Sequence, residues 1–247
     1  MICYIFDGSF EGLLTSIYEA YYMKEKVEEI IPLSKFQPTL LTEPKYIETN
    51  EVKSSKVYTA IKNKISTGAL ELIYHVYLSE IDGCCSLIYN YVKLGFKIGG
   101  KVNLHLHEDV VLNIHNISNK VTNECHRMLG FVRFKFITNM YYSSVEPDHN
   151  IIGLLAPHFS ERLPNERWII HDLKRNIAVF YNKKEWILTT FTAENVDSIT
   201  IKEEPELYES LWKDFFNTIA IAERTNPAYQ KRNMPKRYWK HLTEFEK

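Results

Sequence analysis

Apolar residues recur every three or four positions through most of residues 10–130, and this spacing predicts a succession of amphipathic helices. The first helix follows a short buried strand, "ICYIF", and Asp7 or Ser9 is placed to cap its start. Three further helices are expected over the apolar stripes at 57–65, 70–81 and 87–92.

Glycines and prolines set the expected limits of these elements. Gly95 stands where the helix over 87–92 should end. A longer helix is striped from Val110 to Met128 and is expected to end at Gly130. Prolines at positions 32, 38 and 44 predict a linking loop after the first helix.

The apolar period changes from about 3.6 to 2 at Gly130, which indicates strands. "FVRFKFI" alternates, and Thr138-Asn139 is a plausible hairpin turn into "MYYSSVE". A short amphipathic helix is expected over residues 150–160. The runs "RWIIHD", "NIAVFY" and "EWILTTF" then have the spacing of an antiparallel meander.

Beyond Pro205, apolar residues repeat every four positions from Leu207 to Ile219 and predict one more helix. The fold class is therefore α+β. Residues 1–130 should form a mainly helical half with a short N-terminal strand. Residues 131–247 should form a half with a mainly antiparallel sheet, a short helix, a closing C-terminal helix and a basic tail. The two halves are expected to pack as one compact unit.

The composition is that of a globular protein in the cytoplasm. Hydrophobic residues make up 45% of the chain and charged residues 25%. No apolar run approaches the roughly 20 residues of a membrane helix, and the N-terminus lacks the basic region of a signal peptide. The cysteines at 3, 84, 85 and 125 form no CxxC pair, so we expect reduced thiols, no metal and no cofactor.

Positive charge is concentrated near the C-terminus of a chain whose formal net charge is -1. Residues 224–240 carry Lys or Arg at six positions and no acid, with Tyr229, Tyr238 and Trp239 among them. Cations neutralise phosphates and aromatic rings stack on exposed bases, so this pattern favours a nucleic-acid contact. The alternative is a solvated extension whose rings anchor a loose end. The candidate nucleic-acid-binding residues are Arg127, Arg133, Arg224, Lys231, Arg232, Lys236, Arg237, Tyr238, Trp239 and Lys240.

Titratable side chains gather in "VEPDHN" and in "APHFSER", which follows it. Asp148 is placed to cap the helix expected at 150–160, which is the structural interpretation. The functional alternative is a general acid–base pair, because histidine titrates near neutral pH and a neighbouring carboxylate tunes it. Candidate catalytic residues are Glu124, His126, Glu146, Asp148, His149 and His158.

The end of the long helix, "NECHRMLGF", offers a second polar cluster. Arg127 and a charged His126 would be favoured there by the helix dipole. Arg127 and Arg133 together would form a reasonable phosphate cradle.

Other polar residues have simpler explanations. His105 and His107 in "HLHED" are weak evidence for a metal. Arg162, Asp172 and Arg175 are expected to form surface ion pairs, which contribute little individually. The sequence contains no Walker loop, GxGxxG, GxSxG or HExxH motif, which argues against nucleotide-driven motors, dinucleotide enzymes, α/β hydrolases and zincins.

Four blocks together resemble one family. They are "YIFDGSFEGLLTSIYEAY", "ECHRMLGFVRF", "EPDHNIIGLLAPHFSER" and "ERTNPAYQKRNMPKRYWKHL". In this order, and over nearly the whole chain, they resemble uncharacterised bacterial proteins labelled "probable DNA metabolism protein". The resemblance implies a role beside DNA, since related domains are fused ahead of a uracil-DNA glycosylase domain or, alone, associated with a radical-SAM DNA modification or repair protein. It implies no glycosylase activity and no iron–sulfur cluster for this chain, and it assigns no catalytic residue.

Three hypotheses follow. The first is a DNA-repair or DNA-modification accessory protein that binds DNA, or a radical-SAM or glycosylase partner, through its basic and aromatic surface. The second is an enzyme acting on nucleic acid with the Glu, Asp and His cluster. The third is a protein–protein adaptor anchored by Tyr238 and Trp239 without DNA contact.

Overall fold

The structure, a computed structural model, describes residues 2–23, 27–40, 42–137, 139–191, 207–219 and 221–245. The chain divides into two compact units, Met1–Thr122 and Asn123–Lys247, and each is described by itself. The border lies inside one long helix, α5 (Asp109–Phe131). The division predicted after residue 130, and the packing of the two halves as one compact unit, stay predictions.

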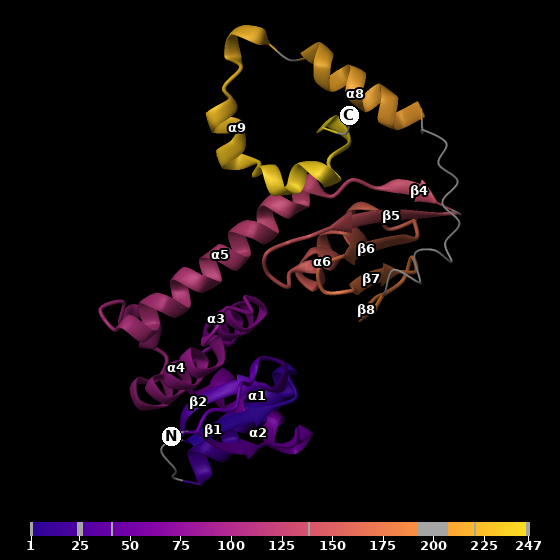
Figure 1. The fold of residues 1–247 in the computed structure, drawn as a ribbon. Helices are drawn as coiled ribbons and strands as arrows, with labels where there is room; N and C mark the ends of the chain where they lie inside the picture. The colour runs from indigo at the N-terminus through magenta and orange to yellow at the C-terminus, as the bar shows by residue number, and fades with distance from the viewer. Residues whose placement is uncertain are drawn as a thin grey trace. The chain divides into compact units, whose positions relative to one another are not determined.

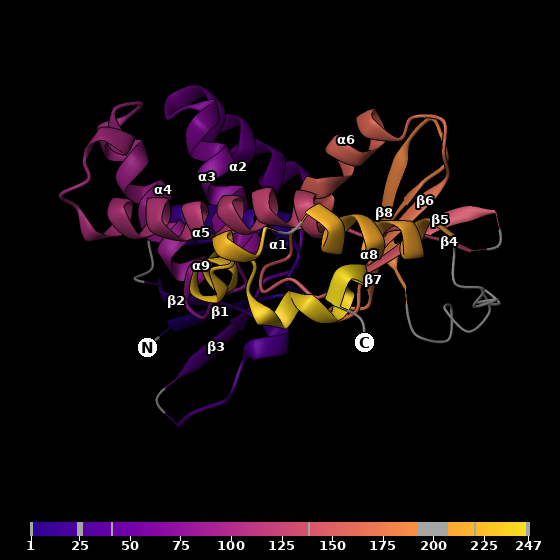
Figure 2. The same cartoon turned by 90° about the horizontal axis from the view of Figure 1, so that it is seen from above.

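The first unit contains a parallel sheet whose central strand is β1 (Ile2–Phe6). On one side β1 pairs with β2 (Val27–Pro32) and on the other with β3 (Glu43–Tyr46), which Figure 2 shows beside β1. The strand at "ICYIF" is thus confirmed. The linking loop predicted from the prolines is wrong in part, because the prolines at 32 and 44 lie in strands. A sheet edge tolerates proline since it need not donate a ladder hydrogen bond there.

Helices follow the predicted apolar stripes closely. The helices that begin in this unit are α1 (Phe10–Tyr22), α2 (Glu51–Lys64), α3 (Thr67–Leu78), α4 (Cys84–Ile98) and α5. The Ser9 hydroxyl caps α1 by accepting a hydrogen bond from the Gly12 N–H at 2.9 Å, as predicted. The helix α4 runs past Gly95 to Gly99, whose φ of 81° suits glycine. Gly95 instead gives room to Ile65, which a Cβ there would approach to 2.5 Å.

The apolar faces of these helices meet in one core. Many of its most buried members come from the predicted stripes, among them Leu13, Ile61, Ile73, Ile88 and Ile114, each 0% exposed. Most stripe residues therefore face the core, whereas Tyr21 and Tyr74, which follow the same spacing, are 59% and 39% exposed.

The second unit is built on a mixed sheet in the order β4-β5-β6-β7-β8. Its strands are β4 (Lys135–Ile137), β5 (Met140–Val145), β6 (Trp168–Asp172), β7 (Ile177–Tyr181) and β8 (Trp186–Thr190). The antiparallel meander from β6 to β8 and the β4–β5 hairpin are confirmed. Asn139 has the positive φ, 75°, that such a turn needs, and Thr138 lies outside the described residues. β5 and β6 pair in parallel, because α6 (Ile152–Arg162) connects them.

The second unit also contains helices. α6 lies against β6, β7 and β8, as Figure 1 shows. α8 (Leu207–Ile219) confirms the predicted C-terminal helix over its described residues. It is followed by α9 (Pro227–Asn233) and by the 3-10 helix η4 (Lys236–His241). The chain is α+β, with helices prevailing in its N-terminal half and a mainly antiparallel mixed sheet in its C-terminal half. Among the described residues, no helix combines the length and apolar character needed to cross a membrane.

Candidate nucleic-acid interface

The basic segment, residues 224–240, folds into two stretches with different surroundings. We call residues 224–236 the exposed part. Residues 237–240, together with the next residue, His241, form the docked part. Asn226 starts α9 by accepting a hydrogen bond from the Tyr229 N–H at 3.0 Å, and Pro227 occupies the first helical turn. Met234 and Pro235 then end α9, and the chain continues as η4.

Tyr238 anchors the docked part. Its side chain is 2% exposed, and its ring lies 5.6 Å from that of Phe131 at the end of α5. Its hydroxyl donates a hydrogen bond to the Glu124 carboxylate, also on α5. Burial and the adjacent Glu124 carboxylate raise the pKa of Tyr238, so the hydroxyl stays protonated and can donate. In this position the ring is not available for stacking on a base.

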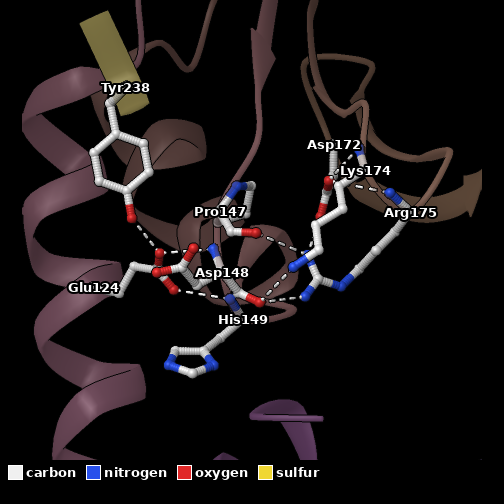
Figure 3. Close-up of polar contacts among 8 residues, drawn as sticks. All are labelled: Glu124, Pro147, Asp148, His149, Asp172, Lys174, Arg175 and Tyr238. Carbon is white, nitrogen blue, oxygen red and sulfur yellow. Dashed lines mark hydrogen bonds and ion pairs between the residues drawn. The ribbon is translucent and has the colours of Figure 1, made fainter. Parts of the chain in front are cut away.

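Glu124 joins three separate parts of the chain (Figure 3). The residue is only 6% exposed, and besides Tyr238 it accepts the backbone N–H of Asp148 at 2.8 Å and of His149 at 2.9 Å. A buried carboxylate needs such donors to offset its loss of water. Glu124 therefore fixes the turn after β5 and the docked part of the basic segment to the same helix.

A second buried acid holds the same turn from its other side. Asp172, 0% exposed, accepts from the guanidinium of Arg175 at 2.8 Å and from the backbone N–H of Lys174 at 2.9 Å. Arg175 in turn donates to the backbone oxygens of Pro147 at 3.1 Å and Asp148 at 2.7 Å (Figure 3). The ion pair predicted for Asp172 and Arg175 is therefore confirmed, but its placement at the surface is wrong for Asp172, whose side chain is 0% exposed, while that of Arg175 is 10% exposed.

The cations of the docked part meet acids of the turn after β5. Arg237 lies 2.6 Å from the Asp148 carboxylate, and Lys240 lies 2.6 Å from Glu146. His241 Nε2 is 3.7 Å from the second oxygen of Glu146. The capping role expected for Asp148 is wrong: α6 follows Ile151 and has no side-chain cap, while the Asp148 carboxylate faces Arg237.

Arg133 is paired as well. It donates to Glu244 at 2.8 and 3.3 Å, and Trp212 donates to the same carboxylate at 3.1 Å. Burial alone would raise the pKa of Glu244, but the hydrogen bonds from Arg133, from its own backbone and from Trp212 lower it overall. The phosphate cradle expected from Arg127 and Arg133 thus has one arginine engaged by an acid.

The exposed part presents its cations differently. The side chains of Arg224, Lys231, Arg232 and Lys236 are exposed, and none has a carboxylate partner among the described residues. Tyr229, on α9, is 66% exposed. Lys236 lies 5.8 Å from the ring of Trp239, which stacks on Phe245 at 4.3 Å. Arg127 on α5 is likewise exposed without a carboxylate partner in the described chain.

The candidate catalytic residues come together only in part. Glu124 contacts the backbones of Asp148 and His149, and Glu146 engages Lys240 and His241 instead. His126 is exposed on α5, and the His158 ring packs edge-on against Phe159 in α6. Glu124, with three donors already bound, has little capacity left to accept a substrate proton.

The residues considered for metal binding do not form a metal site. No group of three or more His, Cys, Asp or Glu side chains suited to a metal occurs among the described residues. The rings of His105 and His107 lie 5.4 Å apart and His107 Nε2 is 3.7 Å from the Glu108 carboxylate, but these residues do not form such a group.

Sequence reasoning missed the acids and bases that complete these contacts. Glu244 and His241 were not singled out, although each contacts a candidate residue. Glu244 lies 111 residues from its partner Arg133, and His241 lies about a hundred residues from its partner Glu146, so no local spacing identifies them.

Comparison with known proteins gives one match. No curated protein and no solved structure matches the chain. The model of a family described as domain of unknown function DUF4130 matches residues 83–244, which is more than half of the chain and takes in nearly all of the second unit. The protein therefore belongs to the DUF4130 family of domains of unknown function.

Proposed function

We propose that this protein binds DNA through the exposed part of its basic segment, as an accessory protein of DNA repair or modification. The observation that carries the proposal is that the exposed part holds four exposed cations with no carboxylate partner in the described chain, together with the exposed ring of Tyr229. Cations in that state can neutralise phosphates and release counterions without first breaking an ion pair. The exposed Tyr229 ring offers a stacking surface for a base.

The contacts of the docked part and of Arg133 reduce the set of residues to which DNA binding can be assigned. Arg237, Lys240 and Arg133 already face carboxylates, and Tyr238 is buried. A phosphate that approaches these cations also approaches the carboxylates of Asp148, Glu146 and Glu244, whose like charge repels it. The proposal therefore assigns binding to Arg224, Lys231, Arg232 and Lys236 and gives the docked part the task of holding them in place.

The partner belongs to the same proposal. The resemblance of the four sequence blocks implies a radical-SAM or glycosylase protein that works on the bound DNA. On this view the present chain supplies affinity for the backbone and the partner supplies the chemistry.

The experiment is a titration of labelled single-stranded and duplex DNA at several salt concentrations. Affinity should fall with salt, and replacing Lys231, Arg232 and Lys236 by alanine should lower it about tenfold or more and flatten the salt dependence. The matched control removes three exposed lysines of the first unit, at positions 93, 97 and 101, and thus the same charge. Equal loss in both variants, or no loss in either, would refute the assignment.

An adaptor role is the second candidate, and α8 favours it. Leu211, Phe215 and Ile219 are spaced four residues apart, so they share a helix face, and each is more than half exposed. Apolar faces of this kind commonly contact other proteins. Association with the purified radical-SAM protein in the absence of DNA, lost on replacing Leu211 and Phe215 by serine, would support the adaptor. Association that needs DNA would count against it.

A further inference from the structure

A pocket in the first unit has walls of aromatic rings and lysines. It lies between α1 and α2 beside the end of α4, with a volume of about 170 Å³. Its lining includes Tyr18, Tyr21 and Tyr22 of α1, Phe96 of α4, and Lys56 and Lys64 of α2. Every element around it belongs to the same compact unit.

The rings at this pocket form a continuous aromatic surface. Tyr18 and Tyr22 stack with their centroids 4.3 Å apart, and Tyr21 meets Phe96 edge-on at 5.9 Å. Tyr21 is 59% exposed and Tyr22 65%, although both belong to a helix whose other face is buried in the core. Two such rings left open to solvent beside a pocket give flat faces on which another ring can stack.

The charge at the pocket is positive. Lys56 Nζ lies 5.9 Å from the Tyr18 ring, and neither Lys56 nor Lys64 has a carboxylate partner among the described residues. The nearby acid, Glu19, is already bound by Lys53. The pocket lining contains no Asp or Glu, so a ligand that fits this chemistry is both aromatic and anionic.

The size of the pocket limits what enters it. Pockets that hold a whole drug-sized molecule have volumes of about 300 Å³ or more, so a pocket of about 170 Å³ admits one ring system. A more open hollow continues along α2 and shares Lys56 and Lys64 with the pocket. Its further lining includes Ser55, Thr59 and Asn63, whose polar side chains suit a sugar and phosphate, and one acid, Glu51, at the first position of α2.

We propose that this pocket binds a nucleotide, whose base stacks on Tyr21 and Tyr22 while Lys56 and Lys64 bind its phosphate. The nucleotide is either free or part of a single strand, since both present the same base and phosphate. This site lies in the first unit and does not depend on the DNA contact assigned to the basic segment in the second.

The test uses the full chain and four probes: thymidine monophosphate, thymidine, inorganic phosphate and a short oligo-thymidine strand. Binding is followed by calorimetry and by the NMR signals of the tyrosine rings. The monophosphate should bind more tightly than the nucleoside or phosphate alone. The Tyr21→Ala variant should weaken it at least about fivefold, because stacking of one base is worth that much or more. Replacing Lys56 and Lys64 by glutamine should abolish the advantage of the monophosphate over the nucleoside.

Matched control positions lie on α2, outside the pocket lining. Tyr58→Ala and Lys62→Gln remove an exposed ring and an exposed cation of α2 that do not line the pocket, and both should bind as the unaltered protein does. Because Tyr21 is exposed, Tyr21→Ala should fold, and Tyr21→Phe should retain stacking and most of the affinity. Binding of the strand but not the monophosphate would identify strand DNA as the source of the nucleotide. Failure of both to bind, or binding unaffected by Tyr21→Ala and by the lysine changes, would overturn the proposal.

Discussion

The two parts of the basic segment have similar compositions and different surroundings. In the docked part, Arg237 and Lys240 face Asp148 and Glu146, and Tyr238 is buried on Glu124. In the exposed part, Lys231, Arg232 and Tyr229 are exposed, and neither cation has a carboxylate partner in the described chain. The difference comes from acids about a hundred residues earlier, which fold against one part only. Local charge therefore does not define an interface until its intramolecular partners are known.

The largest effect is expected at the anchor of the docked part. Glu124→Ala would leave the Tyr238 hydroxyl and two backbone N–H groups buried without an acceptor, so the free energy of unfolding should fall by about 3 kcal/mol or more. Denaturation followed by tryptophan fluorescence measures it, because all 4 tryptophans lie in the second unit. Glu161→Ala, at an exposed position of α6, is the control and should change stability by less than about 0.5 kcal/mol.

Removing only the donor should have a smaller effect. Tyr238→Phe keeps the ring against Phe131 but deletes the hydroxyl that donates to Glu124, leaving the two backbone donors in place. We expect a loss of about 1 to 2 kcal/mol in the same denaturation experiment. A stability equal to that of the unaltered protein would show that the Tyr238 hydroxyl does not hold the docked part.

Low pH should weaken the ion pair between Glu244 and Arg133. Its pKa is lowered in the folded protein, so its carboxylate stabilises the fold above the pKa of the unfolded chain, about 4.3. That contribution, about 1 kcal/mol, disappears as the pH falls through the lowered pKa of the folded state. The difference in unfolding free energy between the unaltered protein and Glu244→Gln should therefore shrink as the pH is lowered below about 4.3. A constant difference across that range would contradict the assignment.

The smallest effect is expected at the exposed ion pair. The side chains of Arg237 and Asp148 are each 52% exposed, and such pairs contribute little in water. Asp148→Asn keeps the backbone N–H that Glu124 accepts and should cost less than about 0.5 kcal/mol. A loss as large as that of Tyr238→Phe would mean that the ion pair, and not the buried anchor, holds the docked part.

Much of the fold follows from local pattern. The helical stripes, the hairpin at Asn139 and the meander were predictable because each depends on residues close together in the sequence. The edge strands β2 and β3 were not. "VEEIIP" and "EPKY" are short and contain proline, and they become strands only through pairing with β1.

In the candidate site, too, the features that depend on local sequence were predictable and the long-range contacts were not. The basic segment was evident from charge and rings alone, and Glu124 was named as a candidate catalytic residue from its polar surroundings in the sequence. The contacts that neutralise Arg237 and bury Tyr238 depend on the turn after β5 reaching both α5 and η4. Asp172 likewise looked like a surface acid because only the folded sheet covers it. Contacts between residues so far apart in the sequence produce no local sequence pattern from which they could be predicted.

The central claim is that the exposed part, and not the docked part, binds DNA. The most direct measurement compares two variants that each remove two positive charges: Lys231 and Arg232 replaced by alanine, or Arg237 and Lys240 replaced by alanine. Their DNA affinities and salt dependences are measured side by side. The account predicts about tenfold weaker binding and a salt slope reduced by about 2 for the first variant, with little change for the second. Equal losses, or a larger loss in the second variant, would contradict it.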